Sequence, residues 1–263
     1  MVSCITDSGF KNSLGYYDSK SKELYLKHPF SKKKEAEDVY EWAECAQTHG
    51  LEKIVIGIGA IEGFMAETAI DDIYLSSRAV MRQALEHTKA FDANVLIEIL
   101  LRVEKCKDLK VISLKAFSFE GQTIMFDMLM KTIRIHKNIE LLDLNGCFFT
   151  EEQLVEMAEF IGNSNIAQVN WPEPVMSDET IEIVKKNLSN NEVLVVLNGV
   201  PRSMQEVAIK NRRDLLCNAK YQLALSDAEV NKIKNNREAV RIAINYEQNA
   251  LIELQKTIES ILI

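Results

Sequence analysis

The sequence predicts an α/β solenoid, in which short parallel strands alternate with helices that line one face of the sheet. The motif L-x-x-L-x-L occurs three times and once more weakly, at Leu109–Leu114, Ile139–Leu144, Ile166–Trp171 and Glu192–Leu197. The fourth residues of these copies are 30, 27 and 26 residues apart. Such a period is typical of stacked strand–helix units, because no single unit can bury its own apolar face.

Each copy predicts a strand followed by a helix. In the second copy Leu142 and Leu144 are two residues apart and therefore share one face of a strand. Apolar residues at 154, 157, 158 and 161 then have helical spacing. Thr150 and Gln153 fit a capping box at the start of this helix. The third copy is followed by a similar helix, which begins at Ser177 and ends before Asn191.

The chain before the clear repeats is predicted to contain an entry cap. Residues 1–30 form this cap, in which residues 14–26 are expected to be a hairpin around a polar turn. Leu24–Leu26 also fits the strand of a terminal repeat, so the two interpretations stay open. A helix over 31–48 and a repeat strand over Leu51–Ile56 follow.

The segment between Ile56 and Leu109 has two interpretations. Ile70–Leu75 fits the strand motif, and the 58 residues from Ile54 to Ile112 would hold two repeats of average length. We therefore expect a short repeat over 57–68 and a long one over 76–108, with a helix at 92–103. In the alternative, no strand forms at 70–75 and a helical hairpin is inserted there.

The last quarter of the chain is predicted to be helical. Pro201 ends the repeat region of residues 31–200, because proline cannot donate a hydrogen bond in a following strand. In the C-terminal helical region, residues 201–263, one helix covers 203–222 and a long amphipathic helix follows. The long helix carries a coiled-coil seam with Glu247 as its polar interruption. The seam residues are Val240, Ile244, Leu251, Leu254, Ile258 and Ile261.

These motifs resemble leucine-rich repeats of the long, ribonuclease-inhibitor-like type. Cys147 fills the family's Asn/Cys position in the second copy, whereas Phe117, Pro174 and Val200 occupy it elsewhere. The resemblance implies a curved module that binds a protein on its concave face. Degenerate repeats in a small acidic chain are also similar to leucine-rich-repeat effectors of intracellular bacterial pathogens. That second resemblance implies virulence and secretion into the cytosol of a host cell.

Composition limits the partners and the setting. The chain has 263 residues, a net charge of −8 and a pI near 5.2, which argues against a nucleic-acid binder with a basic face. The apolar run Val95–Leu101 is too short to span a membrane. Five scattered cysteines without C-x-x-C indicate reduced thiols, and Met1–Asp7 does not resemble a signal peptide, so we expect a cytoplasmic protein.

No sequence motif predicts catalysis. Gly57–Gly63 is one residue away from a dinucleotide fingerprint and is better explained as a repeat turn. Cys147 is expected to be a buried corner residue and His136 to lie at a helix end, so they do not form a reactive pair. The four histidines are scattered and give no metal set. We therefore expect no enzyme, no cofactor and no metal.

The expected binding surface is the concave face of the sheet. Its residues are Tyr25, Val55, Tyr74, Val111, Ser113, Leu141, Asp143, Asn145, Gln168, Asn170, Leu194 and Val196. Exposed apolar groups on such a face indicate a covering element, which is either a partner protein or the chain's own C-terminal helices. Two hypotheses follow: a protein-binding module, or an oligomeric scaffold that self-associates through the C-terminal helix.

Overall fold

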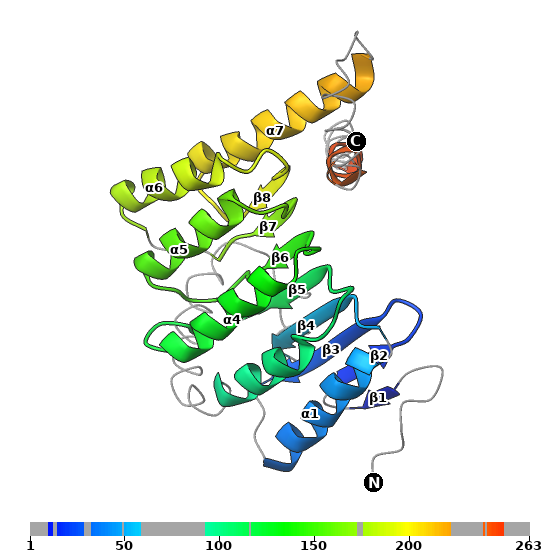
Figure 1. Ribbon diagram of the computed structural model, residues 1–263. Coiled ribbons are helices and arrows are strands. Elements are labelled where there is room, and N and C mark those ends of the chain that lie inside the picture. Colours follow the sequence, from blue (N-terminus) through cyan, green and yellow to red (C-terminus); the bar gives the residue numbers. More distant parts are fainter. Residues whose placement is uncertain are drawn as a thin grey trace, which may run out of the picture.

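The computed structural model describes residues 10–12, 15–28, 33–48, 50–58, 93–115, 117–172, 176–221, 239 and 241–249. The fold is α/β, with an eight-stranded sheet whose strands follow the chain order from β1 to β8 (Figure 1). The first three strands pair antiparallel, and β3 to β8 are parallel. The strands are β1 (Phe10–Asn12), β2 (Gly15–Asp18), β3 (Glu23–His28), β4 (Lys53–Ile58), β5 (Val111–Leu114), β6 (Leu141–Asp143), β7 (Gln168–Asn170) and β8 (Val196–Asn198).

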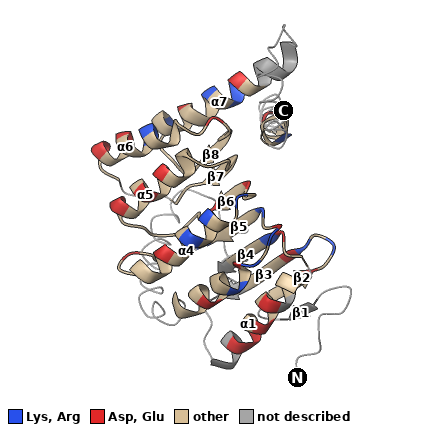
Figure 2. Cartoon of the chain, viewed as in Figure 1, with Lys and Arg blue, Asp and Glu red and all other residues tan. Residues whose placement is uncertain are grey.

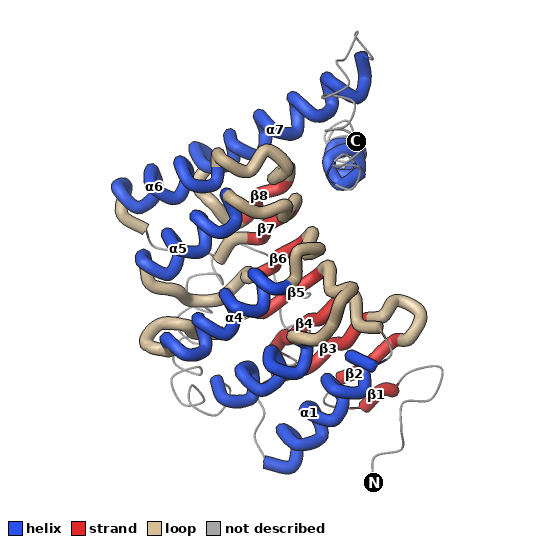
Figure 3. Tube along the Cα trace, viewed as in Figure 1, coloured by secondary structure: helices blue, strands red, loops and turns tan. Residues whose placement is uncertain are grey.

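A described helix follows each parallel strand, and these helices line one face of the sheet (Figure 3). They are α1 (Lys33–Thr48), residues 93–103, α4 (Thr123–Ile135), α5 (Glu151–Gly162), α6 (Asp178–Leu188) and α7 (Arg202–Tyr221). A further helical segment, residues 241–249, lies beside β8 on the side away from α6 (Figure 1). The described helices that connect parallel strands therefore all lie on the same side of the sheet.

The main core lies between the sheet and these helices. Apolar residues that are paired from strand to strand form its central row: Leu24, Ile54, Ile112, Leu142, Val169 and Leu197. The helices contribute the residues predicted from their spacing, such as Leu154, Met157 and Ile161 on α5. This row confirms the predicted faces of the strands in the first three copies.

The predicted helix starts are confirmed where the chain is described. Thr150 and Gln153 form the capping box of α5, with each side chain bonded to the other's backbone N–H. Ser177 caps α6 by accepting from Thr180 N–H. The Glu151 carboxylate accepts from the Ser177 N–H at 2.7 Å, so the starts of α5 and α6 are also tied to each other.

The hairpin expected near the N-terminus is confirmed, and so is its alternative. β2 and β3 pair antiparallel around the turn at 19–22, with Tyr17 opposite Leu24. β3 also pairs in parallel with β4, placing Leu24 beside Ile54. Leu24–Leu26 is therefore both the second strand of the hairpin and the first parallel strand.

The prediction that residues 70–75 form a strand between β4 and β5 is wrong. β4 pairs directly with β5, with Ile54 beside Ile112, and leaves no place for a strand between them. The 58-residue interval is thus one strand–helix unit with a long insertion. Residues 59–92 lie outside the described residues, whereas the helix expected at 92–103 is present as 93–103.

The register predicted for the fourth copy is also wrong. Val196 pairs with Gln168 and Leu197 pairs with Val169, so Leu197, not Val195, is the fourth residue of this copy. Leu194 consequently takes the first position and is fully buried in the main core. It does not face outward as expected.

Candidate functional site

The face of the sheet opposite α1, α4, α5 and α6 carries two rows of side chains, and we call it the outer face. The strand pairing aligns the residues of one row: Tyr16, Tyr25, Val55, Ser113, Asp143, Asn170 and Asn198. The second row consists of Glu23, Lys53, Val111, Leu141, Gln168 and Val196. Asn145 follows β6 and is exposed, and Tyr74 lies outside the described residues.

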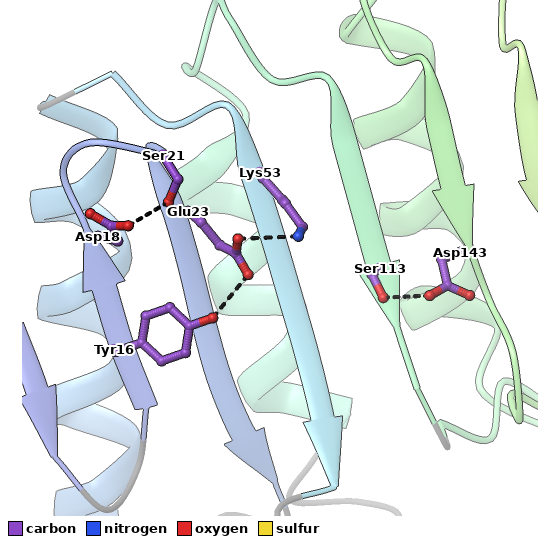
Figure 4. Close-up of polar contacts among 7 residues, drawn as sticks. All are labelled: Tyr16, Asp18, Ser21, Glu23, Lys53, Ser113 and Asp143. Carbon is purple, nitrogen blue, oxygen red and sulfur yellow. Dashed lines mark hydrogen bonds and ion pairs between the residues drawn. The ribbon is translucent and has the colours of Figure 1, made fainter. Parts of the chain in front are cut away.

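The β2–β4 end of the outer face is aromatic and charged. The rings of Tyr16 and Tyr25 stack with their centroids 5.2 Å apart. Tyr16 donates its hydroxyl to the Glu23 carboxylate at 3.1 Å, and Lys53 Nζ donates to the same carboxylate at 3.1 Å (Figure 4). Tyr16 and Glu23 were not predicted. The pairing of β2 with β3 places Tyr16 directly opposite Tyr25 and so brings it to the outer face.

The centre of the outer face combines a buried acid with apolar side chains. Ser113 Oγ donates to Asp143 Oδ2 at 2.9 Å (Figure 4). The Asn145 N–H donates to Asp143 Oδ1 at 3.3 Å. Val111 and Leu141 are adjacent in the neighbouring row and are half-buried. These two residues therefore keep accessible apolar surface beside a fixed polar pair.

A charged triad lies where the parallel strands β4 and β5 begin. Glu52 pairs with Lys22 at 2.8 Å and with Lys110 at 2.8 Å, each lysine using a different carboxylate oxygen. Hydrogen bonds from Lys110 and Lys22 lower the pKa of Glu52 to about 2. The same contacts raise the pKa values of both lysines. The Glu52 carboxylate is shared by two lysines, and we assign the triad to the stability of the strand entrances.

The β7–β8 end of the outer face is covered by the chain itself. Ala239 and Ala243 belong to a cluster that is separate from the main core and also contains Ala167, Val193, Val195, Val196 and Leu215 of α7. The sequence left open whether the C-terminal helix packs on the predicted solenoid or on another chain. Its described part packs beside β8 of the sheet. Of the predicted seam, Ile244 is 41% exposed, and Val240, Leu251, Leu254, Ile258 and Ile261 lie outside the described residues.

The thiol and imidazole singled out in the sequence are both buried. Cys147 Sγ donates to the Leu114 carbonyl oxygen at 3.2 Å. Burial lowers the pKa of His136, although the backbone at Val103 and Cys106 opposes this shift. Within the described residues, no group of three or more His, Cys, Asp or Glu side chains could hold a metal ion.

The helix layer carries mixed charge. Figure 2 shows acidic residues along α1, α5 and α6 and basic residues on α4 and α7. Acidic and basic residues therefore interleave over the layer, in contrast to the basic face that a general nucleic-acid binder needs. In the part of the chain that the structure describes, none of the helices has the length and apolarity to cross a membrane.

Comparison with known proteins leaves the family open. No protein family matches the chain, and no curated protein does. One similar solved structure is described as "Leiomodin-1 Actin-Binding Site 2 (ABS2)". It has a TM-score of 0.38 and 13% identity, over 51% of this chain and 84% of that chain. This likeness is too weak to assign a family.

Proposed function

We propose that this chain is a protein-binding module of the leucine-rich-repeat type, a solenoid whose outer face holds another protein. The proposal rests above all on Val111 and Leu141. They are half-buried apolar residues at the centre of a sheet face, next to the fixed Ser113–Asp143 pair. Apolar side chains bordered by ordered polar groups are typical of protein interfaces, where the apolar centre supplies affinity and the polar rim supplies specificity.

The module is proposed to act by binding and not by catalysis. The potential reactive groups Cys147 and His136 are buried, and both oxygens of the Glu52 carboxylate are held by lysines. The net charge of −8 favours a protein partner over a nucleic acid. The resemblance to bacterial effectors adds the hypothesis that the partner is a host protein, so host-cell lysate is the appropriate source for a capture experiment.

The double variant Val111→Arg with Leu141→Arg tests the proposal. It places two charges at the centre of the outer face without touching the main core. We expect this variant to lose a protein that the unaltered chain captures. The control Ile183→Arg introduces a charge on α6, where Ile183 is 40% exposed. It should retain the captured protein.

The proposed use of the outer face is wrong if the double variant captures the same protein as the unaltered chain. Both variants must first show the melting temperature of the unaltered chain within a few degrees. If the double variant is unstable, Val111→Ser with Leu141→Ser removes the apolar groups with less desolvation and provides the same comparison.

Assembly through the C-terminal helix is a second candidate, favoured by Ile244. This residue is 41% exposed and belongs to the predicted seam. Leu251→Glu with Leu254→Glu should then lower the mass measured by light scattering, while the repeat units still unfold cooperatively. A monomeric unaltered chain would contradict this candidate.

A further inference from the structure

The segment that leads into the last strand, β8, is apolar on both sides. Leu194 and Leu197 enter the main core, whereas Val195 and Val196 belong to the separate cluster under the C-terminal helix. Val196 lies on the outer face of β8, and Val195 directly precedes this strand. Both are buried, and the cluster that covers them consists of Leu215 of α7 together with Ala239 and Ala243 of the C-terminal helix.

The covering helix approaches the sheet through small side chains. Ala239 and Ala243 are four residues apart, lie on one side of the helix and are buried at 4% and 0% exposure. Alanine has no atoms beyond Cβ, so the helix backbone can lie close to Val195 and Val196. A larger residue at position 243 would hold the helix away from the sheet.

One arginine fixes the orientation of this helix. Arg212, on α7, donates from Nη1 to the Val195 carbonyl oxygen at 2.8 Å and from Nε to the Glu247 carboxylate. Its guanidinium also lies 4.4 Å from the centre of the Tyr246 ring. The Arg212 side chain is only 12% exposed, so its charge is removed from most of the solvent. A buried charge of this kind requires an acidic partner.

The helix contacts therefore follow a simple pattern. Ala239, Ala243 and Glu247 are spaced by four residues, so two small groups meet the apolar strip and an acid meets Arg212. The contact is modest, because alanines bury little area and Glu247 remains 46% exposed. A helix held in this way can be displaced by a competing helix.

We propose that the outer surface of β7 and β8 is a binding site for an amphipathic helix, which the chain's own residues 239 and 241–249 fill in this structure. The partner that the site accepts is a helix with two small residues and an acid at i, i+4 and i+8. This inference rests on the proposed function, because it names the class of partner that the outer face takes. The chain's own helix competes at an effective concentration of about millimolar, so it limits access of the partner.

A labelled peptide with the sequence of residues 236–252 provides a direct probe. Ala243→Arg in the full chain should displace the resident helix and open the site. The matched control Asn245→Arg introduces the same charge on the exposed side of the same helix. By fluorescence anisotropy, we expect the Ala243→Arg chain to bind the peptide at least about tenfold more tightly than the unaltered chain or the control.

The contact with Arg212 is tested with the same assay. A peptide carrying Glu247→Lys should bind the opened chain at least about tenfold more weakly, because it brings a positive charge to a buried guanidinium. An opened chain that unfolds cooperatively and yet binds neither peptide would overturn the proposal. Equal binding by the opened, unaltered and control chains would also overturn it, since the peptide would then occupy another surface.

A second variant covers the case in which Ala243→Arg does not fold. If Ala243→Arg fails to fold, Glu247→Lys in the full chain opens the site by removing the partner of Arg212. The general proposal for the outer face is tested separately, with the Val111 and Leu141 variants, so a failure of one proposal is distinguishable from a failure of the other. Those residues lie on β5 and β6, outside the cluster that the helix covers.

Discussion

Replacing Asn191 with alanine should destabilise the protein by about 3–5 kcal/mol. This side chain is 2% exposed and connects three segments of the chain. Its Nδ2 donates to the carbonyl oxygens of Ile161 at 2.8 Å and Ile166 at 3.0 Å. Its Oδ1 accepts from the N–H groups of Val193 at 2.9 Å and Leu194 at 3.0 Å. Asn191 thus joins the end of α5 to the entrances of β7 and β8.

The magnitude follows from these four hydrogen bonds. Each has a net worth of about 1 kcal/mol, and a buried group left without a partner costs about 1–3 kcal/mol. Alanine would leave the N–H groups of Val193 and Leu194 and the Ile166 carbonyl oxygen without these bonds. The Ile161 carbonyl oxygen would still accept from Ser164, and partial entry of water would limit the loss. Asn191→Asp should be comparably destabilising, because its carboxylate would face the Ile161 and Ile166 carbonyl oxygens.

Urea unfolding followed by circular dichroism measures the effect. The exposed neighbour Asn190 provides the control, and Asn190→Ala should change the free energy of unfolding by less than about 0.5 kcal/mol. The slope of the transition should be the same in both variants. The reasoning is refuted if the free energies of the Asn191→Ala and Asn190→Ala chains agree within about 1 kcal/mol.

Two further substitutions and one labelling experiment test the fold. Gly162→Ala should lower the melting temperature despite alanine's higher helix propensity, because the added Cβ would lie 2.1 Å from the Asn187 carbonyl oxygen. Glu52→Gln should reduce the loss of stability on acidification, measured by urea unfolding at several pH values. Because the pKa of Glu52 is lowered from 4.5 to about 2, its contribution is complete above pH 4.5 and disappears toward pH 2. Cys147 should react slowly with a thiol reagent in the native protein, since it is buried; labelling at the rate of an exposed thiol would contradict its placement.

Sequence patterns predicted the strands whose two faces differ. In β6, Leu142 enters the core and Asp143 faces outward, so the alternation assigns each residue to one face. The start of α5 was equally clear, because Thr150 and Gln153 are a local signal that depends on no distant residue.

Predictions that depend on distant parts of the chain failed or could not be made. Ile70–Leu75 satisfies the strand motif locally, but the direct pairing of Ile54 with Ile112 leaves it no place in the sheet. Strand formation is decided by the available neighbours more than by intrinsic preference. Arg212 was missed for a similar reason, because its partners Val195 and Glu247 are 17 and 35 residues away and form no motif.

The error in the last copy has a more specific cause. Val193–Leu197 is a run of five apolar residues, and a shift of two residues preserves the alternation of a strand, so the pattern cannot determine the register. The asparagines resolve it: Asn198 pairs with Asn170, and its side chain donates to Asn170 Oδ1 at 3.0 Å. With Leu197 in the fourth position, the last spacing becomes 28 residues, close to the 27 and 30 before it.

The corrected register also explains why the C-terminal helix returns to the sheet. Once Leu194 and Leu197 occupy the core, Val195 and Val196 are surplus apolar residues that need a second cover. Leu215 of α7 supplies one part of this cover. A run that is apolar on both faces at the end of a sheet therefore predicts an additional covering element, and Ala239 and Ala243 provide it here. Glu247 is explained by the same geometry, since the acid that interrupts the predicted seam is the partner of Arg212.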